Sequence, residues 1–525
     1  MLIRYYKKII TFTIIVLSIL VFNINLGYTF SQEEIQLFNL LNQLRTKQGL
    51  KPLIYSEKAS FICRQHSLNM KQKNFFSVES PNLGSIDYQL QKNSIFDRVN
   101  RTFIFVDHDI KNIPKKITQM KDSLIGENDS THIGIGIVSG EGPKYGQNIL
   151  WITLVFLERI VNLNPVPPVV VKLGQKLTIK GEVEYPFVKP EMPVTLPNGN
   201  VKVFKNELQD DRFFSFTFSF DQGNGKYNLE IMVTHPNYGP KVAAIIPIYA
   251  GINYPPPNKQ KKKLENFKTT NDAAKFMINL VNSDRQKFNL KALKYDQLLS
   301  YTAYYHSKDM ATRKFFAHIN PDGKGPTDRY KEAGGVGYVS ENIAYDKTIQ
   351  DAQIGLMESP GHRANILDKN ATHIGIGVYF DGKQYYITQL FKKVTPIIDT
   401  YDTVLYLIKS INEKRVKLGK KAFFHDSLLS NIASEHSKDM AFSGNLNEVA
   451  GGIRIYDRFI KHGGKYNKFQ TLFYMGDSVD SLKESLLKDE HLLTEDYTNI
   501  GIGIYQKSHN KYGENLLWVT ICLTI

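Results

Sequence analysis

The chain has 525 residues but only two cysteines, Cys63 and Cys522. Because they lie near opposite ends of the chain, no disulfide framework can hold its domains together, and stability must come from apolar cores. We expect both thiols to be free and buried, with a bridge between them as the alternative.

Long apolar runs are also scarce, with one at the N-terminus. It extends from Ile9 to Phe22, is 14 residues long and follows three basic residues. This length suits the core of an export signal and is short for a membrane span. We therefore predict that 1–30 is a signal peptide. Residues 27–30 lack a small-x-small cleavage pattern, so retention as an N-terminal anchor is the alternative. We expect membrane contact only through this segment.

Acidic residues are outnumbered, with 51 Asp and Glu against 66 Lys and Arg, for a net charge of +15. Such a surface favours anionic partners, including cell-wall polymers and lipid headgroups. The sequence has no basic helix and no basic stripe interleaved with aromatics, so we predict no nucleic-acid partner.

A chain of this length needs several cores, and internal repeats show where they lie. Two motifs occur three times. The first is His306-Ser307-Lys308-Asp309-Met310, which returns at 436–440 and, in looser form, at 66–70. The second is Thr372-His373-Ile374-Gly375-Ile376-Gly377, with counterparts at 131–136 and 498–503. One fold used three times is the simplest explanation.

The repeats and the composition between them predict six segments. These are a signal or anchor at 1–30, a degenerate repeat at 31–161, a β-sandwich spacer at 162–252, a Pro/Lys linker at 253–269, a repeat with an intact cleft at 270–395 and a second degenerate repeat at 396–525. Short strands separated by turns predict that the spacer is an all-β, immunoglobulin-like sandwich.

Each repeat carries helical patterns first and a glycine-rich hairpin last, which predicts an α+β domain. In the middle repeat, Ile374, Ile376 and Val378 alternate with Gly375 and Gly377. Glycines on one face of a strand allow another element to approach closely, so we expect a helix packed against them. His306, which recurs in all three copies, is predicted to be a core histidine.

The middle repeat resembles the CAP superfamily, which comprises cysteine-rich secretory proteins, antigen 5 and pathogenesis-related 1. The resemblance is to its bacterial, cysteine-poor branch of SCP-like extracellular proteins. The motifs that carry it are 316–318 (Phe-Ala-His), 340–344 (Ser-Glu-Asn-Ile-Ala) and 359–367 (Ser-Pro-Gly-His-Arg-Ala-Asn-Ile-Leu). The resemblance implies an α-β-α sandwich with a central cleft, secreted or held at the cell surface.

The resemblance also implies a cleft lined by two histidines and two acidic residues. His318, Glu341 and His362 match three of these positions, and Glu358 is the candidate for the fourth. Leu356 lies near the place of the family's usual tryptophan. Such a set implies a divalent metal such as zinc, since catalytic zinc needs three protein ligands and one open position.

Three interpretations stay open. The favoured one is a secreted or surface-anchored binding and scaffold protein for lipid, cell-wall or protein ligands. The second is a metal-assisted hydrolase that uses His318, Glu341 and His362, for which no activated nucleophile is visible. In the third, the same residues form a hydrogen-bonded structural cluster without chemistry, and the whole chain is a structural adhesin.

We expect the flanking repeats to lack the cluster. The position of His318 is predicted to hold Val78 in the first repeat and Glu448 in the third, and that of Glu341 to hold Gln470 in the third. His362-Arg363 is predicted to correspond to Lys121-Asp122 and Lys488-Asp489.

Overall fold

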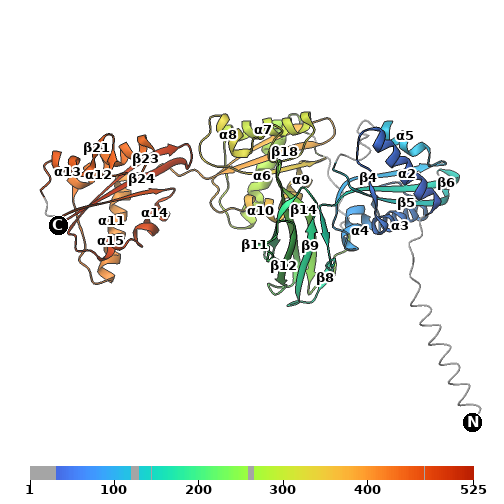
Figure 1. The fold of residues 1–525 in the computed structure, drawn as a ribbon, viewed down its shortest axis with the longest axis horizontal. Helices are drawn as coiled ribbons and strands as arrows, with labels where there is room; N and C mark the ends of the chain where they lie inside the picture. The colour runs from blue at the N-terminus through green and yellow to red at the C-terminus, as the bar shows by residue number, and fades with distance from the viewer. Residues whose placement is uncertain (1–30, 120–128, 143–144, 258–264, 266, 466–467) are drawn as a thin grey trace, which may run out of the picture. The chain divides into compact units, whose positions relative to one another are not determined.

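A computed structural model describes residues 31–119, 129–142, 145–257, 265, 267–465 and 468–525. The predicted signal or anchor at 1–30, the Lys121-Asp122 pair and part of the predicted linker lie outside these residues. No helix in the described part of the chain is long and apolar enough to cross a membrane. The chain forms two compact units: the first holds the first repeat and the strand-rich segment, and the second holds the other two repeats (Figure 1).

Each repeat contains a four-stranded sheet with one strand order. In the middle repeat the order is β15 (Lys294–Tyr295), β17 (His373–Phe380), β18 (Tyr385–Lys392), β16 (Ser340–Asp346). The first repeat has β1 (Ile54–Tyr55), β5 (His132–Gly142), β6 (Gly146–Glu158) and β4 (Arg98–Asp107), and the third has β19 (Phe424–His425), β23 (Asn499–His509), β24 (Gly513–Thr524) and β22 (Phe469–Gly476). The predicted hairpin is therefore the centre of a sheet whose outer strand in the middle repeat carries Glu341.

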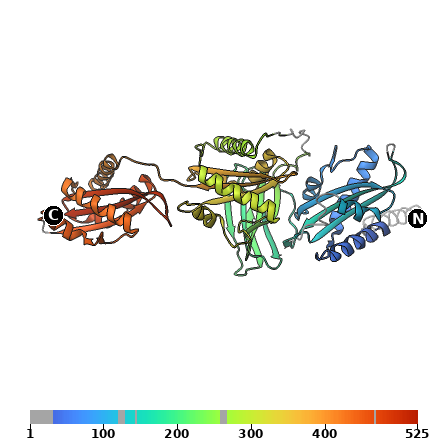
Figure 2. The same cartoon turned by 90° about the horizontal axis from the view of Figure 1, so that it is seen from above.

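Helices cover both faces of the middle sheet (Figure 2). On one face lie α7 (Gln297–Arg313) and α8 (Pro326–Glu332), and on the other lie α6 (Thr270–Lys287), α9 (Ile349–Glu358) and α10 (Pro360–Ile366). The apolar face of α6 begins after a capping box between Thr269 and Asp272, which fixes the start of the helix. This arrangement is the expected α-β-α sandwich.

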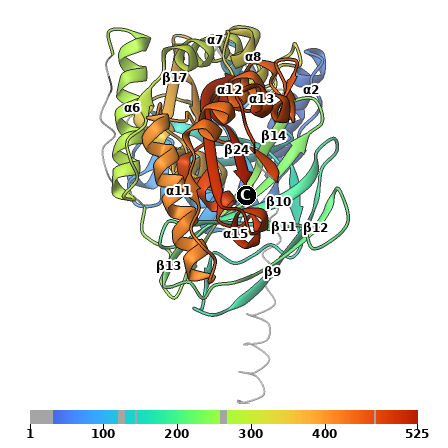
Figure 3. The same cartoon turned by 90° about the vertical axis from the view of Figure 1, so that its left-hand side faces the viewer.

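The flanking repeats have corresponding helices. The first has α2 (Gln32–Lys47), α3 (Glu57–Lys73), α4 (Ile86–Lys92) and α5 (Asn112–Gln119), and short strands β2 (Glu79–Ser80) and β3 (Gly84–Ser85). The third has α11 (Thr400–Lys417), α12 (Ser427–Ser443), α13 (Ile455–Lys461), α14 (Val479–Leu486), α15 (Glu490–Thr494), β20 (Val449–Ala450) and β21 (Ile453–Arg454). In the third repeat α11 and α12 contact the two sides of the sheet (Figure 3).

The glycines of the central strands allow the expected close approach of a helix. A Cβ atom on Gly377 would lie 2.0 Å from the backbone nitrogen of Tyr304 in α7. The matching distances are 2.1 Å at Gly136 and 2.0 Å at Gly503, each to the backbone of the equivalent helix. The recurrence of the motif is therefore a packing requirement of the fold.

The strand-rich segment forms two sheets around one shared apolar core. One sheet has the order β11 (Val201–Lys205), β10 (Val188–Thr195), β13 (Gly225–His235), β14 (Gly239–Ala250), β8 (Val170–Val171), and the other has β12 (Phe213–Ser219), β9 (Lys176–Val183), β7 (Val161–Leu163). Strand β10 was not predicted from the sequence. The kinship of the whole strand-rich segment to the immunoglobulin fold stays a prediction.

The buried side chains include cysteine and arginine. Cys63 and Cys522 are free and buried, as predicted. A buried arginine lies in the first helix of each repeat, and Arg285 donates to the carbonyl oxygens of Lys291, Ile366 and Asp368 at 2.8–2.9 Å. Since Arg415 makes the same kind of contacts with Lys421 and Leu492, this arginine ties the first helix to later loops.

Candidate functional site

Glu341 is the centre of the polar cluster in the middle repeat. It lies on β16 opposite Leu390 of β18, and its side chain is only 1% exposed. Burying a charged carboxylate without partners costs free energy, so the contacts of Glu341 decide whether it is ionised.

Both carboxylate oxygens of Glu341 are engaged. Nδ1 of His318 lies 2.9 Å from Oε1, and Nη2 of Arg329 donates to Oε2 at 2.6 Å. Burial raises the pKa of Glu341, but Arg329, His306 and His318 together outweigh burial, so the pKa lies below its ordinary value. Glu341 is therefore an ionised and paired carboxylate.

Arg329 also fixes the loop that carries His318. Its Nη1 atom donates to the carbonyl oxygens of His318 and Lys324, each at 2.7 Å. One guanidinium thus holds the carboxylate and the loop in one geometry. No role was predicted for Arg329 from the sequence. The signal that could have found it is an Arg at the fourth position of the short helix in two repeats, Arg329 in α8 and Arg458 in α13.

His306 lies behind this cluster in α7. Its Nε2 atom is 3.1 Å from the carbonyl oxygen of Ala317 and 4.0 Å from Oε1 of Glu341. Burial lowers the pKa of His306 to about 4, against a smaller opposing effect of Glu341. The expected core histidine is confirmed, but only one ring nitrogen has a partner among the described residues, because Nδ1 makes no hydrogen bond.

His362 lies on α10 and has a different partner. Its Nδ1 atom is 2.7 Å from the hydroxyl of Ser359, which immediately precedes that helix. Burial lowers the pKa of His362 to about 3, with a further contribution from the charge of His318. The imidazole is therefore neutral at physiological pH.

Amide side chains join α10 to the sheet. Asn342 donates to the carbonyl oxygen of His362 at 3.1 Å and to Oε1 of Gln389 at 3.0 Å. Asn365 returns from α10 to the carbonyl oxygen of Glu341 and to Asn342. Gln389 continues to Gln353 of α9. The 340–344 and 359–367 motifs therefore meet in one hydrogen-bonded network.

The predicted fourth residue, Glu358, lies elsewhere. It is exposed at the end of α9, whereas Glu341 is enclosed. No group of three or more His, Cys, Asp or Glu is arranged to hold a metal in the described part of the chain. Because Glu341 already bonds to His318 and Arg329, its oxygens do not fit a metal ligand, and the zinc site stays a prediction that this geometry does not support.

Matching hydrogen bonds define the equivalent positions in the other repeats. The Nε2 atom of the core histidine contacts the carbonyl oxygen of Ser77 in the first repeat, Ala317 in the middle repeat and Asn447 in the third. The residue that follows each of these is Val78, His318 or Glu448. His318 therefore corresponds to Val78 and Glu448, as predicted. Sheet register gives a different result for Glu341.

The serine after the core histidine bonds to Thr153, Thr388 or Thr520. Two residues after each of these threonines, the strand pairs with the neighbouring outer strand of the sheet. The paired residue on that outer strand is Thr102 in the first repeat, Glu341 in the middle repeat and Thr471 in the third. The prediction of Gln470 was therefore wrong by one residue, and the position of Glu341 is a threonine in both flanking repeats.

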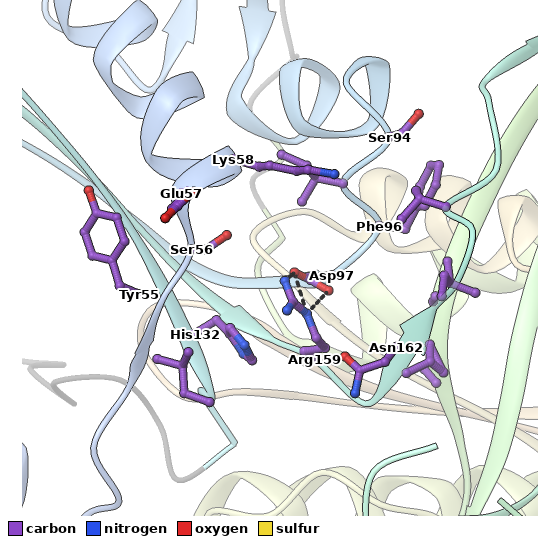
Figure 4. Close-up of a pocket in the computed structure, with 17 residues that line it drawn as sticks. Tyr55, Ser56, Glu57, Lys58, Ser94, Phe96, Asp97, His132, Arg159 and Asn162 are labelled. Carbon is purple, nitrogen blue, oxygen red and sulfur yellow. Dashed lines mark hydrogen bonds and ion pairs between the residues drawn. The ribbon is translucent and has the colours of Figure 1, made fainter. Parts of the chain in front are cut away.

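Two cavities of the described residues lie away from His318, Glu341 and His362, none of which lines either of them. One, of about 330 Å³, lies in the first unit, where Arg159 and Asp97 form an ion pair at 2.8 Å near His132 (Figure 4). The other, of about 610 Å³, lies in the middle repeat between α7 and α8.

Comparison with known proteins supports the resemblance. The model of the CAP family, the cysteine-rich secretory protein family, matches residues 38–156 and 278–391. The uncharacterized protein YkwD of Bacillus subtilis (strain 168) is 40% identical over 111 residues, which are 21% of this chain and 43% of that protein. The uncharacterized membrane protein YlbC of the same organism is 32% identical over 149 residues, 28% of this chain and 41% of that protein.

The chain thus spans less than half the length of either relative. Among solved structures, an extracellular protein containing an SCP domain from Bacillus anthracis str. Ames shares 21% identity with a TM-score of 0.23, over 41% of this chain and 81% of that chain. Residues 396–525 fall outside the two family matches, and their kinship rests on the shared sheet order. Two segments of the chain, residues 38–156 and 278–391, match the CAP family, as the sequence motifs of the middle repeat indicated.

Proposed function

We propose that this protein is an exported binding and scaffold protein that acts on cell-wall material outside the cell. The observation that carries the proposal is the closed state of Glu341, whose two oxygens bond to His318 and Arg329. A paired carboxylate with a lowered pKa is a poor general base. The cluster therefore serves to shape the domain.

Nucleophilic catalysis has equally little support. The hydroxyl of Ser359 does contact His362 at 2.7 Å. However, Ser359 is only 3% exposed and immediately precedes a helix, so a substrate carbonyl cannot reach its hydroxyl without rearrangement. A histidine binds a metal through its neutral imidazole. Because the low pKa of His362 keeps its ring neutral, the metal-assisted hydrolase stays the second candidate function.

Cell-wall material is favoured by charge and by repetition. The net charge of +15 attracts the anionic polymers of a wall. Three related domains along one chain offer several contacts, and linked contacts raise the overall affinity for an extended polymer. Lipid and protein ligands are the alternatives that an experiment must separate.

The test is sedimentation of the chain without residues 1–30 with three materials. These are purified bacterial cell-wall sacculi, anionic phospholipid vesicles and an unrelated protein coupled to beads. We expect the protein to sediment with the sacculi and to be released by high salt, because exposed charges are screened. Retention on vesicles but not on sacculi would replace the wall with a lipid ligand, and no retention on any material would refute the proposal.

A further inference from the structure

The cavity between α7 and α8 in the middle repeat has features that the polar cluster does not explain. It has a volume of about 610 Å³ and is lined by α7, α8 and residues of the loop 320–324. Tyr301 and Tyr305 of α7 line one side, and their side chains are 54% and 50% exposed. Large aromatic side chains at this exposure are commonly involved in recognition.

The two tyrosines form one platform. They are four residues apart on α7, so they lie on the same face of the helix, and their ring centroids are 4.6 Å apart with planes inclined by 54°. Tyr304 supports Tyr305 edge-on, with ring centroids 5.5 Å apart. The platform is therefore held by neighbouring rings.

The flanking repeats do not have this platform. The serine that follows the core histidine aligns the three repeats. At the positions of Tyr301 and Tyr305, the first repeat has Phe61 and Gln65, and the third has Asn431 and Glu435. The buried His306 Nδ1 and Arg329 Nε at this cavity have no partner among the described residues, but the same holds for His436 and Arg458 in the third repeat. At this cavity, the tyrosine pair is thus a feature that distinguishes the middle copy.

Charged side chains that pair with one another also line the cavity. Arg313 bonds to both carboxylate oxygens of Asp309 at 2.5 Å and to Asp322 at 2.8–2.9 Å. Lys324 pairs with Glu332 at 2.6 Å. Asn320 accepts from the backbone of Asp322 and Lys324. The cavity therefore offers both hydrogen-bond donors and acceptors, and its charges are already paired with one another.

We propose that this cavity binds a neutral stretch of a glycan strand, with a sugar ring resting on Tyr301 and Tyr305. A pyranose ring offers an apolar face of C–H groups and a rim of hydroxyls that both donate and accept hydrogen bonds. The paired charges of the cavity suit such a neutral ligand. This inference deepens the proposed function, on which it rests, by naming the part of the wall that is recognised.

A proline-rich peptide also docks on exposed aromatics. Its backbone offers carbonyl acceptors and few donors, so the carboxylates of Asp309 and Asp322 would lose hydrogen-bond donors when water is displaced. Sugar hydroxyls supply such donors. The polar lining of the cavity therefore favours the glycan.

The test is a binding titration of the chain lacking residues 1–30 with a soluble oligomer of β-1,4-linked N-acetylglucosamine. The variant is Tyr301→Ala with Tyr305→Ala, and the control is Tyr295→Ala with Tyr401→Ala, which removes two tyrosines that are 58% and 67% exposed elsewhere. We expect the Kd to rise about ten-fold or more in the variant and to stay unchanged in the control, because each lost ring removes stacking. Tyr301→Phe with Tyr305→Phe keeps the rings and should retain affinity.

Equal affinity of parent and variant, or tighter binding of a proline-rich peptide than of the oligomer, would overturn the inference. Sedimentation with sacculi separates this failure from that of the proposed function. If the Tyr301→Ala/Tyr305→Ala protein still sediments like the parent, the protein binds walls but not through this cavity. If the parent itself does not sediment, the proposed function fails.

Discussion

The Nη2 atom of Arg329 lies 2.6 Å from Oε2 of Glu341, inside the middle CAP domain. This contact pairs the charge of Glu341, and the other predicted carboxylate, Glu358, is exposed elsewhere. The same arginine also holds the loop of His318.

Replacing Arg329 with leucine should destabilise the middle domain by about 3–5 kcal/mol, because it leaves Glu341 buried without its charged partner. Arg313→Leu is the control, since the side chain of Arg313 is 37% exposed and solvent screens its ion pairs, so its loss should have a much smaller effect. Calorimetric unfolding measures both changes. Equal effects of the two substitutions would show that Glu341 does not depend on Arg329.

Gly377→Ala should prevent the middle domain from folding, because the added Cβ would meet the backbone of Tyr304 at 2.0 Å. Gly355→Ala is a matched control on the helix α9, where a Cβ meets nothing within 4 Å. It should stabilise the domain by about 0.5–1 kcal/mol, since glycine is costly inside a helix. Thermal unfolding would contradict the packing account if Gly377→Ala left the transition unchanged.

The buried His306 predicts a loss of stability in acid. Its pKa is lowered from 6.5 to about 4 by burial, so between these values the unfolded chain binds a proton that the folded chain does not. The contribution of His306 to the free energy of unfolding is therefore fully present above pH 6.5. Between pH 6.5 and pH 4 this contribution falls by about 1.4 kcal/mol per pH unit.

NMR titration of the histidine rings measures the cause directly. The exposed His491 is the internal control, because Glu495 raises its pKa. His306 should remain neutral at pH 5 while His491 is protonated. Protonation of His306 near pH 6.5 would contradict its burial.

Both cysteines should be unreactive in the folded protein. Burial raises the pKa of Cys63 and of Cys522 far above the ordinary value, so neither forms the nucleophilic thiolate. A thiol reagent such as 5,5′-dithiobis(2-nitrobenzoate) should label two thiols only after denaturation. Rapid labelling of the native protein would show that the domains open readily.

Much of the fold follows from patterns that reflect local packing. The alternation of Gly375 and Gly377 with isoleucines predicted that a helix packs closely against this strand, because glycines on one face leave room for another backbone. Strand β10 was missed since Pro190 and Pro193 argue against a central strand. The register of β10 shifts between Val188 and Glu191, so a bulge accommodates Pro190.

The site was predictable only in part. Motif matching identified His318 and Glu341, which the structure places in contact. It could not show that Arg329 closes the pair, because the contact depends on how α8 lies against β16. The error between Gln470 and Thr471 has the same origin, since a shift of one residue in a strand moves a side chain to the other face.

We conclude that Glu341 belongs to a closed hydrogen-bonded cluster, and zinc titration followed by calorimetry can contradict this claim. The titrations use the chain lacking residues 1–30 and its His318→Ala and His362→Ala variants. We predict no stoichiometric zinc binding that depends on these two histidines. Tight binding by the parent chain that is lost in both variants would contradict the claim and establish the metal-binding cleft.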